Sequence, residues 1–225
     1  MRELELPIVI LVYDDLFICI SRNFNFIVCY KIQIQMLSPE QVASKIQPII
    51  AKPQSIFLSH YNKLSRSAAV MIIIHYNYKT PHVLLTKRSS GLQSHSSEIS
   101  FPGGKYSLRD KSLRHTAIRE TKEEIGLLLR HKDIIGSLTT VSTLTSNFMI
   151  TPFITLQHKI PQLKILSCEV ERLIDAPIFE LLDTMALDLD HYNSSVNDVY
   201  KFTYKNDIVW GATAKILRKL YEVLF

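Results

Sequence analysis

One helical segment constrains the fold of this chain more than any other. Residues 112–125 contain no glycine or proline, and Gly126 follows at a position where helices commonly end. At 100° per residue, three carboxylates share one face of this segment: Glu120, Glu123 and Glu124. The adjacent strip consists of Ala117, Thr121 and Ile125. We therefore predict a helix that packs this strip on a core and presents three acids beside it.

Helix stability does not account for three like charges. Carboxylates at i, i+3 and i+4 destabilise an isolated helix by a few tenths of a kcal/mol per pair, and near its C-terminal end they oppose the helix dipole. A hard divalent cation such as Mg²⁺ takes oxygen ligands and is held by carboxylates together with substrate phosphates. Arg119, four residues before Glu123, is close enough to orient one carboxylate. Taken alone, the triplet also fits a solvent-exposed acidic face, so its context decides.

Glycine is scarce in this chain, and its positions are informative. Only 6 glycines occur among 225 residues, where average usage near 7% would give roughly 15. Three of them bracket the helical segment: Gly103, Gly104 and Gly126. Each therefore meets a backbone need that other residues serve poorly.

The pattern from residue 66 onward predicts an α/β or α+β sandwich. Two β-branched, apolar runs at 68–76 and 82–88 predict strands joined by a short turn. Further elements are predicted after the carboxylate helix: strands within 134–144 and at 149–157, a short helix at 176–183, a hairpin at 198–210 that turns at 205–207, and an amphipathic helix at 211–224. Mixed strands with helices before and after them imply two or three packed layers.

The first 35 residues differ in style from the rest. Charged residues break them into apolar runs too short to span a bilayer, and acidic residues near their start fit a secretory leader poorly. The sequence pattern changes at Met36: Ser38 and Pro39 predict the start of a short amphipathic helix. We predict a domain at 36–225 and an N-terminal extension at 1–35, which is either a β-prone arm or an over-extension of the reading frame.

The glycines and the helix together resemble the Nudix box, whose general pattern is G-x5-E-x7-R-E-U-x-E-E-x-G-U, with U an aliphatic residue. The second half matches at Arg119, Glu120, Glu123, Glu124, Gly126 and Leu127, with Thr121 at an aliphatic position. In the first half, the spacing from Gly104 to Arg119 is one residue longer than usual, and Asp110 replaces the early Glu. This longer spacing with Asp is similar to the coenzyme A pyrophosphatase branch of the superfamily.

A second pattern of that branch, close to L-L-T-x-R-S-x3-R-x3-G-x3-F-P-G-G, lies upstream. Both of its ends match, at residues 84–89 and 101–104. Gln93 stands where the pattern has arginine, and Ser97 stands where it has glycine. A neutral amide cannot give a phosphate the bidentate, permanently charged contact of an arginine, so the match to a coenzyme A site is incomplete. The resemblance covers roughly residues 60–220.

The resemblance implies the Nudix fold, a mixed β-sheet sandwiched between α-helices, with the box as a loop-helix-loop motif. It implies an enzyme that hydrolyses a nucleoside diphosphate linked to another moiety, with coenzyme A or its derivatives as the first candidates and a phosphopantetheine product plus 3',5'-ADP. Magnesium or manganese ions (Mg²⁺ or Mn²⁺) would be held by Glu120, Glu123 and Glu124. Gly103 and Gly104 would allow close backbone approach or form a turn into the helix.

Other candidate residues are less clearly marked. Several Nudix enzymes draw a catalytic acid from a loop after the box, which makes Glu169 the first candidate for a general base and Glu171 the second. Three cations are candidates for substrate phosphate contacts and fit surface charge or ion pairs equally: Arg66, Arg88 and Lys105. Asp110 fits an outer metal ligand or a partner of the helix dipole.

Composition sets the remaining expectations. Hydrophobic residues make up 47% of the chain and charged residues 21%, which excludes disorder along the whole chain. Three cysteines without C-x-x-C spacing argue against a structural zinc site and favour a reducing, cytoplasmic location. The net charge of +5 suits an anionic small-molecule partner or an ordinary solvated surface. Neither a nucleic acid nor a membrane partner is expected, and the oligomeric state stays open.

Three alternatives to a coenzyme A hydrolase remain open from the sequence. One is a Nudix hydrolase acting on NADH, ADP-ribose or nucleoside triphosphates. Another is a Nudix-folded binding module without turnover, although an intact carboxylate triplet speaks against it. The third is an RNA-end pyrophosphohydrolase, which would need a basic groove with interleaved aromatics that the sequence does not show.

Overall fold

Strand β3 (Ser67–Asn77) lies at the centre of a mixed sheet. The computed structural model describes residues 9–13, 16–20, 37–46, 66–91, 97–143, 147–189 and 199–225. The strand order is β10-β4-β3-β9-β7. The other four strands in this order are β4 (Thr80–Arg88), β9 (Met149–Gln157), β7 (Ile134–Ser137) and β10 (Val170–Pro177). β3 runs parallel to β9, and the other pairs are antiparallel. Three short strands extend these pairings: β5 (Ile99–Ser100), β6 (Gly103–Lys105) and β8 (Val141–Ser142).

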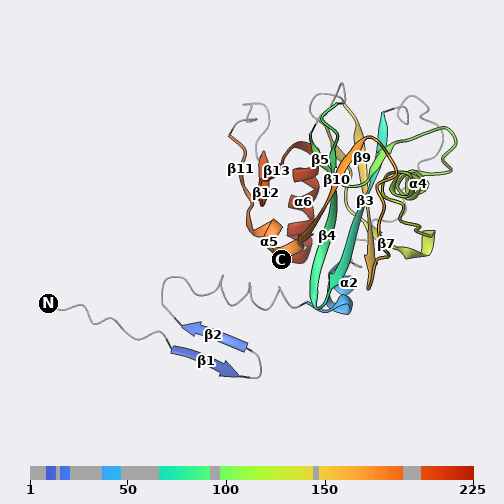
Figure 1. The fold of residues 1–225 in the computed structure, drawn as a ribbon. Helices are drawn as coiled ribbons and strands as arrows, with labels where there is room; N and C mark the ends of the chain where they lie inside the picture. Colours follow the sequence, from blue (N-terminus) through green and yellow to red (C-terminus); the bar gives the residue numbers. More distant parts are fainter. Residues whose placement is uncertain are drawn as a thin grey trace.

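Helices cover both faces of this sheet, as predicted. Residues of β3 from Ser67 to His75 are all buried, and alternate side chains enter two different cores. One core contains the carboxylate helix α4 (Leu113–Ile125), which is followed by a 3₁₀ turn at His131–Asp133. The other core contains α2 (Pro39–Ile46), α5 (Ile178–Asp183) and α6 (Gly211–Leu224). Figure 1 shows α4 and α6 on opposite sides of the sheet, which confirms the sandwich.

A small sheet at the C-terminal side completes the fold. It contains β11 (Ala186–Leu187), β12 (Tyr200–Tyr204) and β13 (Asp207–Val209). The predicted hairpin is present, with its turn at residues 205–206 and Lys205 at φ 54°. Phe202 and Val209 place it in the same core as α6.

Near the N-terminus, β1 (Val9–Tyr13) and β2 (Leu16–Ile20) form an antiparallel pair within the predicted extension. The boundary at residue 35 stays a prediction. Helix α2 begins at Pro39 as expected, and the Ser38 hydroxyl accepts a hydrogen bond from the Gln41 amide at 3.3 Å. Among the described residues, no helix has the length and apolar character needed to cross a membrane.

The stretch after residue 169 contains a strand that was not predicted, and α5 begins at Ile178, two residues later than expected. Residues 170–177 form β10, an edge strand of the main sheet that pairs with β4. Val170, Ile174 and Ala176 are buried at even positions, while the exposed residues between them include Glu171 and Asp175. The alternation is therefore that of a half-buried strand, and the charges of this segment obscure it in the sequence.

Candidate active site

Helix α4 has a defined start and end that fix its rotation on the sheet. The Ser112 hydroxyl accepts a hydrogen bond from the His115 amide at 3.2 Å. Gly126 is left-handed at φ 72° and donates its amide to the Lys122 carbonyl. The strip predicted to face the core is fully buried: Ala117, Thr121 and Ile125. Glu120 and Glu124 consequently lie on the flank of α4 beside β6, and Glu123 is exposed.

Arg119 connects two groups of carboxylates. Its Nε and Nη2 donate to the two carboxylate oxygens of Asp110, each at 2.8 Å. Its Nη1 lies 2.8 Å from Glu120 Oε1 and 3.0 Å from Glu123 Oε2. The guanidinium thus forms a bidentate pair on one side and bridges two helix carboxylates on the other.

Asp110 is the acid that holds Arg119 in place. It is buried, and its oxygens also accept hydrogen bonds from the Thr116 hydroxyl at 2.8 Å and the Ser107 amide at 3.0 Å. The hydrogen bonds from Arg119 hold the pKa of Asp110 well below its usual range, against the opposing effect of burial. In the structure Asp110 anchors Arg119, a role that the sequence analysis did not include.

Gly103 and Gly104 form strand β6 and not a turn into the helix, which decides between the two roles that the sequence left open. Gly103 has φ +156°, and a Cβ there would collide with the Ala69 carbonyl of β3. A Cβ on Gly104 would lie 2.5 Å from the carboxyl carbon of Glu120. Both glycines therefore allow close approach, one to the neighbouring strand and one to a glutamate of α4.

Glu124 is the most buried of the three helix carboxylates, with 8% of the residue exposed. Its Oε2 accepts a hydrogen bond from the Gly103 amide at 3.1 Å. Burial raises the pKa of Glu124 to about 7, and the charges of Glu120 and Glu169 add to the rise, while the Gly103 amide and Arg88 oppose it. Burial also raises the pKa of Glu120, although Arg119 opposes that rise.

Glu169 lies beside this cluster in the turn before β10. Its Oε2 is 2.8 Å from Nη2 of Arg88, which stands at the end of β4. The Ser89 amide donates to the Glu169 carbonyl at 2.8 Å, which fixes the turn against the end of β4. The second candidate base, Glu171, is exposed on β10. The fold therefore brings Glu169 and Arg88 to the acids of α4.

The other predicted site residues lie at the surface or outside the described part. Arg66 is exposed immediately before β3, and Lys105 is exposed at the end of β6 with its ammonium 5.1 Å from the centre of the Phe148 ring. Gln93 lies outside the described residues. Ser97, at the glycine position of the branch pattern, is left-handed with φ 60°.

Sequence reasoning missed two supports of this site. The segment 164–166 donates its amides to the last carbonyls of α4, from Lys164 to Ile125 at 3.3 Å and from Leu166 to Glu124 at 2.9 Å. The Arg88–Glu169 pair joins residues 81 positions apart. No local pattern signals either contact, because both depend on where the chain returns after the sheet has formed.

Similarity to known proteins identifies the family. The NUDIX domain family matches residues 65–172. A protein of Photorhabdus laumondii subsp. laumondii, named "Uncharacterized Nudix hydrolase NudL", is 32% identical over 163 residues, which cover 70% of this chain and 84% of that protein. The chain belongs to the Nudix hydrolase family. As a Nudix hydrolase it is an enzyme that acts on pyrophosphate bonds, and members of the family generally need a divalent metal ion.

Two further proteins agree with this assignment. The similarly named protein of Yersinia pestis (strain Pestoides F) is 32% identical over 183 residues, 80% of this chain and 91% of that protein. The crystal structure of a MutT/nudix family protein from Enterococcus faecalis superposes with a TM-score of 0.51 at 14% identity, covering 71% of this chain. This chain covers 62% of that structure, so it spans less than two thirds of it, and the likeness supports the fold alone.

Proposed function

We propose that this Nudix hydrolase cleaves the diphosphate of coenzyme A or one of its derivatives, with Mg²⁺ or Mn²⁺ held by Glu120, Glu123 and Glu124. The observation that supports the metal site most is the crowding of carboxylates around the buried Glu124. Glu120 and Glu169 are both close enough to disfavour its ionised form, while a backbone amide and Arg88 oppose them. A divalent cation would stabilise the ionised form of several acids at once.

The donor set fits a hard divalent cation. All the candidate ligand atoms are carboxylate oxygens, which Mg²⁺ and Mn²⁺ prefer. Exposure of the side chain rises from 20% at Glu120 to 57% at Glu123, so the group opens toward solvent at its Glu123 end. A cation held by these acids would supply Lewis-acid chemistry, which polarises phosphoryl oxygens and lowers the pKa of a water. Arg119 orients Glu120 and Glu123 through the hydrogen bonds of its Nη1.

The remaining residues are proposed to handle the water and the phosphates. Glu169, held by Arg88, accepts the proton of the attacking water. In the part of the chain that the structure describes, Arg88 Nε is buried and has no hydrogen-bond partner, so one of its donors is left for a ligand. Arg66 and Lys105 bind outer phosphate oxygens, and Gly104 lets the carboxylate of Glu120 approach the backbone of β6.

A substrate panel tests the proposed activity. The purified full chain is assayed with Mg²⁺ or Mn²⁺ on coenzyme A, acyl derivatives, NADH, ADP-ribose and nucleoside triphosphates. We expect the highest kcat/KM on coenzyme A or an acyl form, with 3',5'-ADP as one product. A higher kcat/KM on another substrate would reject coenzyme A and leave the hydrolase site standing. No turnover of any member would reject both.

Gln93→Arg tests the departure from the branch pattern. If the arginine of the branch pattern binds a substrate phosphate, restoring it should raise kcat/KM for coenzyme A by about ten- to a hundredfold. The reason is that a charge-assisted hydrogen bond contributes about 1.5–3 kcal/mol. ADP-ribose turnover should change little. Gln162→Arg, which adds the same charge at an exposed position on the loop after β9, is the matched control. Equal or lower coenzyme A turnover in Gln93→Arg would indicate that the sequence around Gln93 serves another substrate.

A further inference from the structure

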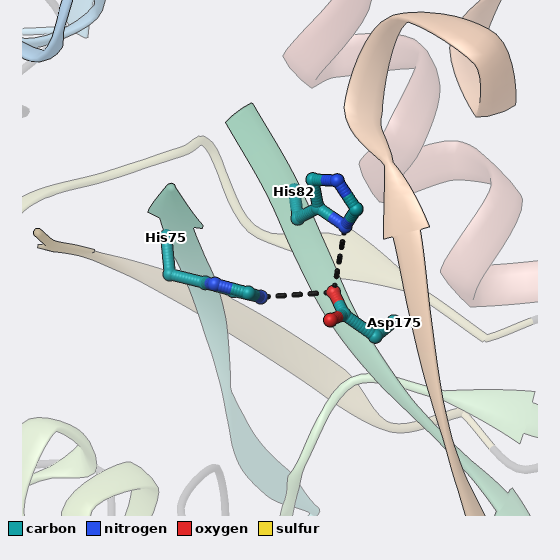
Figure 2. A group of neighbouring side chains, drawn as sticks. All are labelled: His75, His82 and Asp175. Atoms are coloured by element: carbon teal, nitrogen blue, oxygen red, sulfur yellow. Dashed lines mark hydrogen bonds and ion pairs between the residues drawn. The ribbon is translucent and has the colours of Figure 1, made fainter. Parts of the chain in front are cut away.

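A second group of ligand-type side chains lies on the main sheet, away from helix α4. His75 on β3, His82 on β4 and Asp175 on β10 converge on one another (Figure 2). His75 Nε2 is 2.8 Å from Asp175 Oδ1, and His82 Nδ1 is 3.0 Å from the same oxygen. The two imidazole rings are tilted by 47° with their centres 5.5 Å apart.

Strand register brings these residues together. His75 is directly opposite His82 in the β3–β4 pair, and His82 is directly opposite Pro177 in the β4–β10 pair. Asp175 is two residues before Pro177, so it shares the face of His82 and is its diagonal neighbour. Three adjacent strands thus place one polar side chain each on the same face of the sheet.

The group is separate from the candidate active site. Val70 of β3 pairs with Gly103, beside the acids of α4. His75 is five residues further along the same strand, which corresponds to about 17 Å at 3.3 Å per residue. No group of the proposed hydrolytic mechanism belongs to this cluster.

We propose that His75, His82 and Asp175 form a binding site for a divalent transition metal ion of the zinc class. Their ligand atoms all lie within 4.8 Å of one another, and among the described residues no other group of three His, Cys, Asp or Glu side chains meets that limit. Two imidazole nitrogens and one carboxylate oxygen are a donor set that suits Zn²⁺ and similar ions, whereas the all-oxygen acids of α4 suit Mg²⁺.

The geometry requires only small movements to accept the ion. Tetrahedral ligands at about 2.0–2.1 Å from Zn²⁺ lie about 3.3 Å from one another. The observed nitrogen to oxygen distances of 2.8 and 3.0 Å need to open by a few tenths of an ångström. The histidine side chains are 6% and 12% exposed, while Asp175 is 44% exposed, so two ligands are held by packing and the third faces solvent. A water would complete the coordination on that open side.

Metal binding here would tie together the ends of β3, β4 and β10. An ion that binds the folded chain alone stabilises it by mass action. At a free concentration a hundred times its Kd, Zn²⁺ should raise the Tm by about 5–10 °C for a chain of this size.

Spectroscopic titration of the full chain with Co²⁺, followed by displacement with Zn²⁺, tests the site. After removal of bound metal with a chelator, and with excess Mg²⁺ to occupy the acids of α4, we expect visible d–d absorption that saturates at one Co²⁺ per chain and is lost when Zn²⁺ is added. Asp175→Asn and His82→Gln should each weaken binding at least tenfold. Glu124→Gln should leave it unchanged, because that residue lies at the other site. His158→Gln is the matched control, since His158 is exposed on the loop after β9.

The outcomes separate this site from ordinary histidine binding and from misfolding. Equal Co²⁺ affinity in the wild-type chain, Asp175→Asn and His82→Gln would overturn the proposal, as would loss of the signal in His158→Gln. Absence of any Tm rise with Zn²⁺ would also overturn it. If circular dichroism shows that His82→Gln does not fold, Asp175→Asn decides, because its exposed side chain keeps nearly the same shape.

Discussion

Two buried carboxylates, one near the start and one near the end of helix α4, have opposite electrostatic surroundings. Near the start, Asp110 accepts hydrogen bonds from Arg119, Thr116 and the Ser107 amide, and its pKa is lowered. Near the end, Glu124 accepts a hydrogen bond from the Gly103 amide and lies close to other acids, and its pKa is raised to about 7. Two carboxylates of one motif thus have opposite electrostatic surroundings.

This contrast separates a structural acid from acids suited to a ligand. A carboxylate surrounded by donors favours its charged form and stabilises the fold. A carboxylate buried beside other carboxylates disfavours its charged form, and an added cation would relieve that cost. Arg119 takes part in both groups, so Asp110 holds in place the side chain that orients Glu120 and Glu123. Substitutions at either end of α4 should therefore have different effects.

Replacement of Glu124 should give the largest effect of all. Glu124→Gln keeps the shape but removes the charge, and loss of a metal ligand should lower kcat at least about a hundredfold. The Tm should not fall, because the substitution removes a buried charge that lies beside other acids. Glu123→Gln should lower kcat in the same direction. Rates are measured with Mg²⁺ and Mn²⁺, and Tm by calorimetry.

The control for this prediction is Glu222→Gln, which removes a helix carboxylate from an i,i+4 ion pair with Arg218 on α6. It should leave kcat unchanged. Full turnover in both Glu123→Gln and Glu124→Gln would reject the metal ligands that we propose.

Replacement of Asp110 should act mainly on stability. Asp110→Asn leaves Arg119 without its bidentate anion, and breaking a buried pair costs about 3 kcal/mol. For a chain of this size the Tm should fall by about 6–12 °C. Asp133→Asn removes the acid from an Asp–Arg pair whose arginine is largely exposed, and it should cost much less. Equal losses in the two variants would contradict the structural role of Asp110.

The stability difference between the wild-type chain and Asp110→Asn should depend on pH. Hydrogen bonds from Arg119 lower the pKa of Asp110 in the folded chain below its usual value of 3.8. Its contribution is therefore fully present above pH 3.8 and is lost as the pH falls through the lower folded value. Urea unfolding should give a constant difference between pH 7 and about 5 that shrinks below about 4. A difference that already shrinks between pH 7 and 5 would contradict this assignment.

The fold was largely predictable because its elements carry strong local patterns. The runs that became β3, β4 and β9 are apolar and β-branched, and α4 and α6 are bounded by glycines, so each appeared near its final limits. One exception is β10, whose charged residues at 171, 172 and 175 hide a strand that is buried on one face. Its identity depends on pairing with β4, more than eighty residues earlier, which no local pattern contains.

The candidate site was predictable where one helix carries it and less so where strands meet. The helical period placed three acids on one flank of α4 and Ala117 in the core. The role of Asp110 could not be predicted from the sequence, because an acid before a helix fits several roles until its hydrogen-bond partners are known. Arg88 is the last residue of β4, and Glu169 lies immediately before β10. The two residues pair only because β4 and β10 lie side by side in the register observed.

The smallest effects should come from two buried threonines of α4, and they should have opposite signs. The Thr116 hydroxyl donates to Asp110, whereas in the described part of the chain the buried Thr121 hydroxyl has no partner. Valine has nearly the same shape and helix propensity. Thr116→Val should lower the free energy of unfolding by about 1 kcal/mol, and Thr121→Val should raise it by about 1 kcal/mol, because an unsatisfied buried hydroxyl is removed. Thr121 occupies the aliphatic position of the box, so Thr121→Val also restores the family pattern there. Urea unfolding of both variants measures the two changes, and equal losses of stability would show that the contrast between the ends of α4 does not extend to its hydroxyl groups.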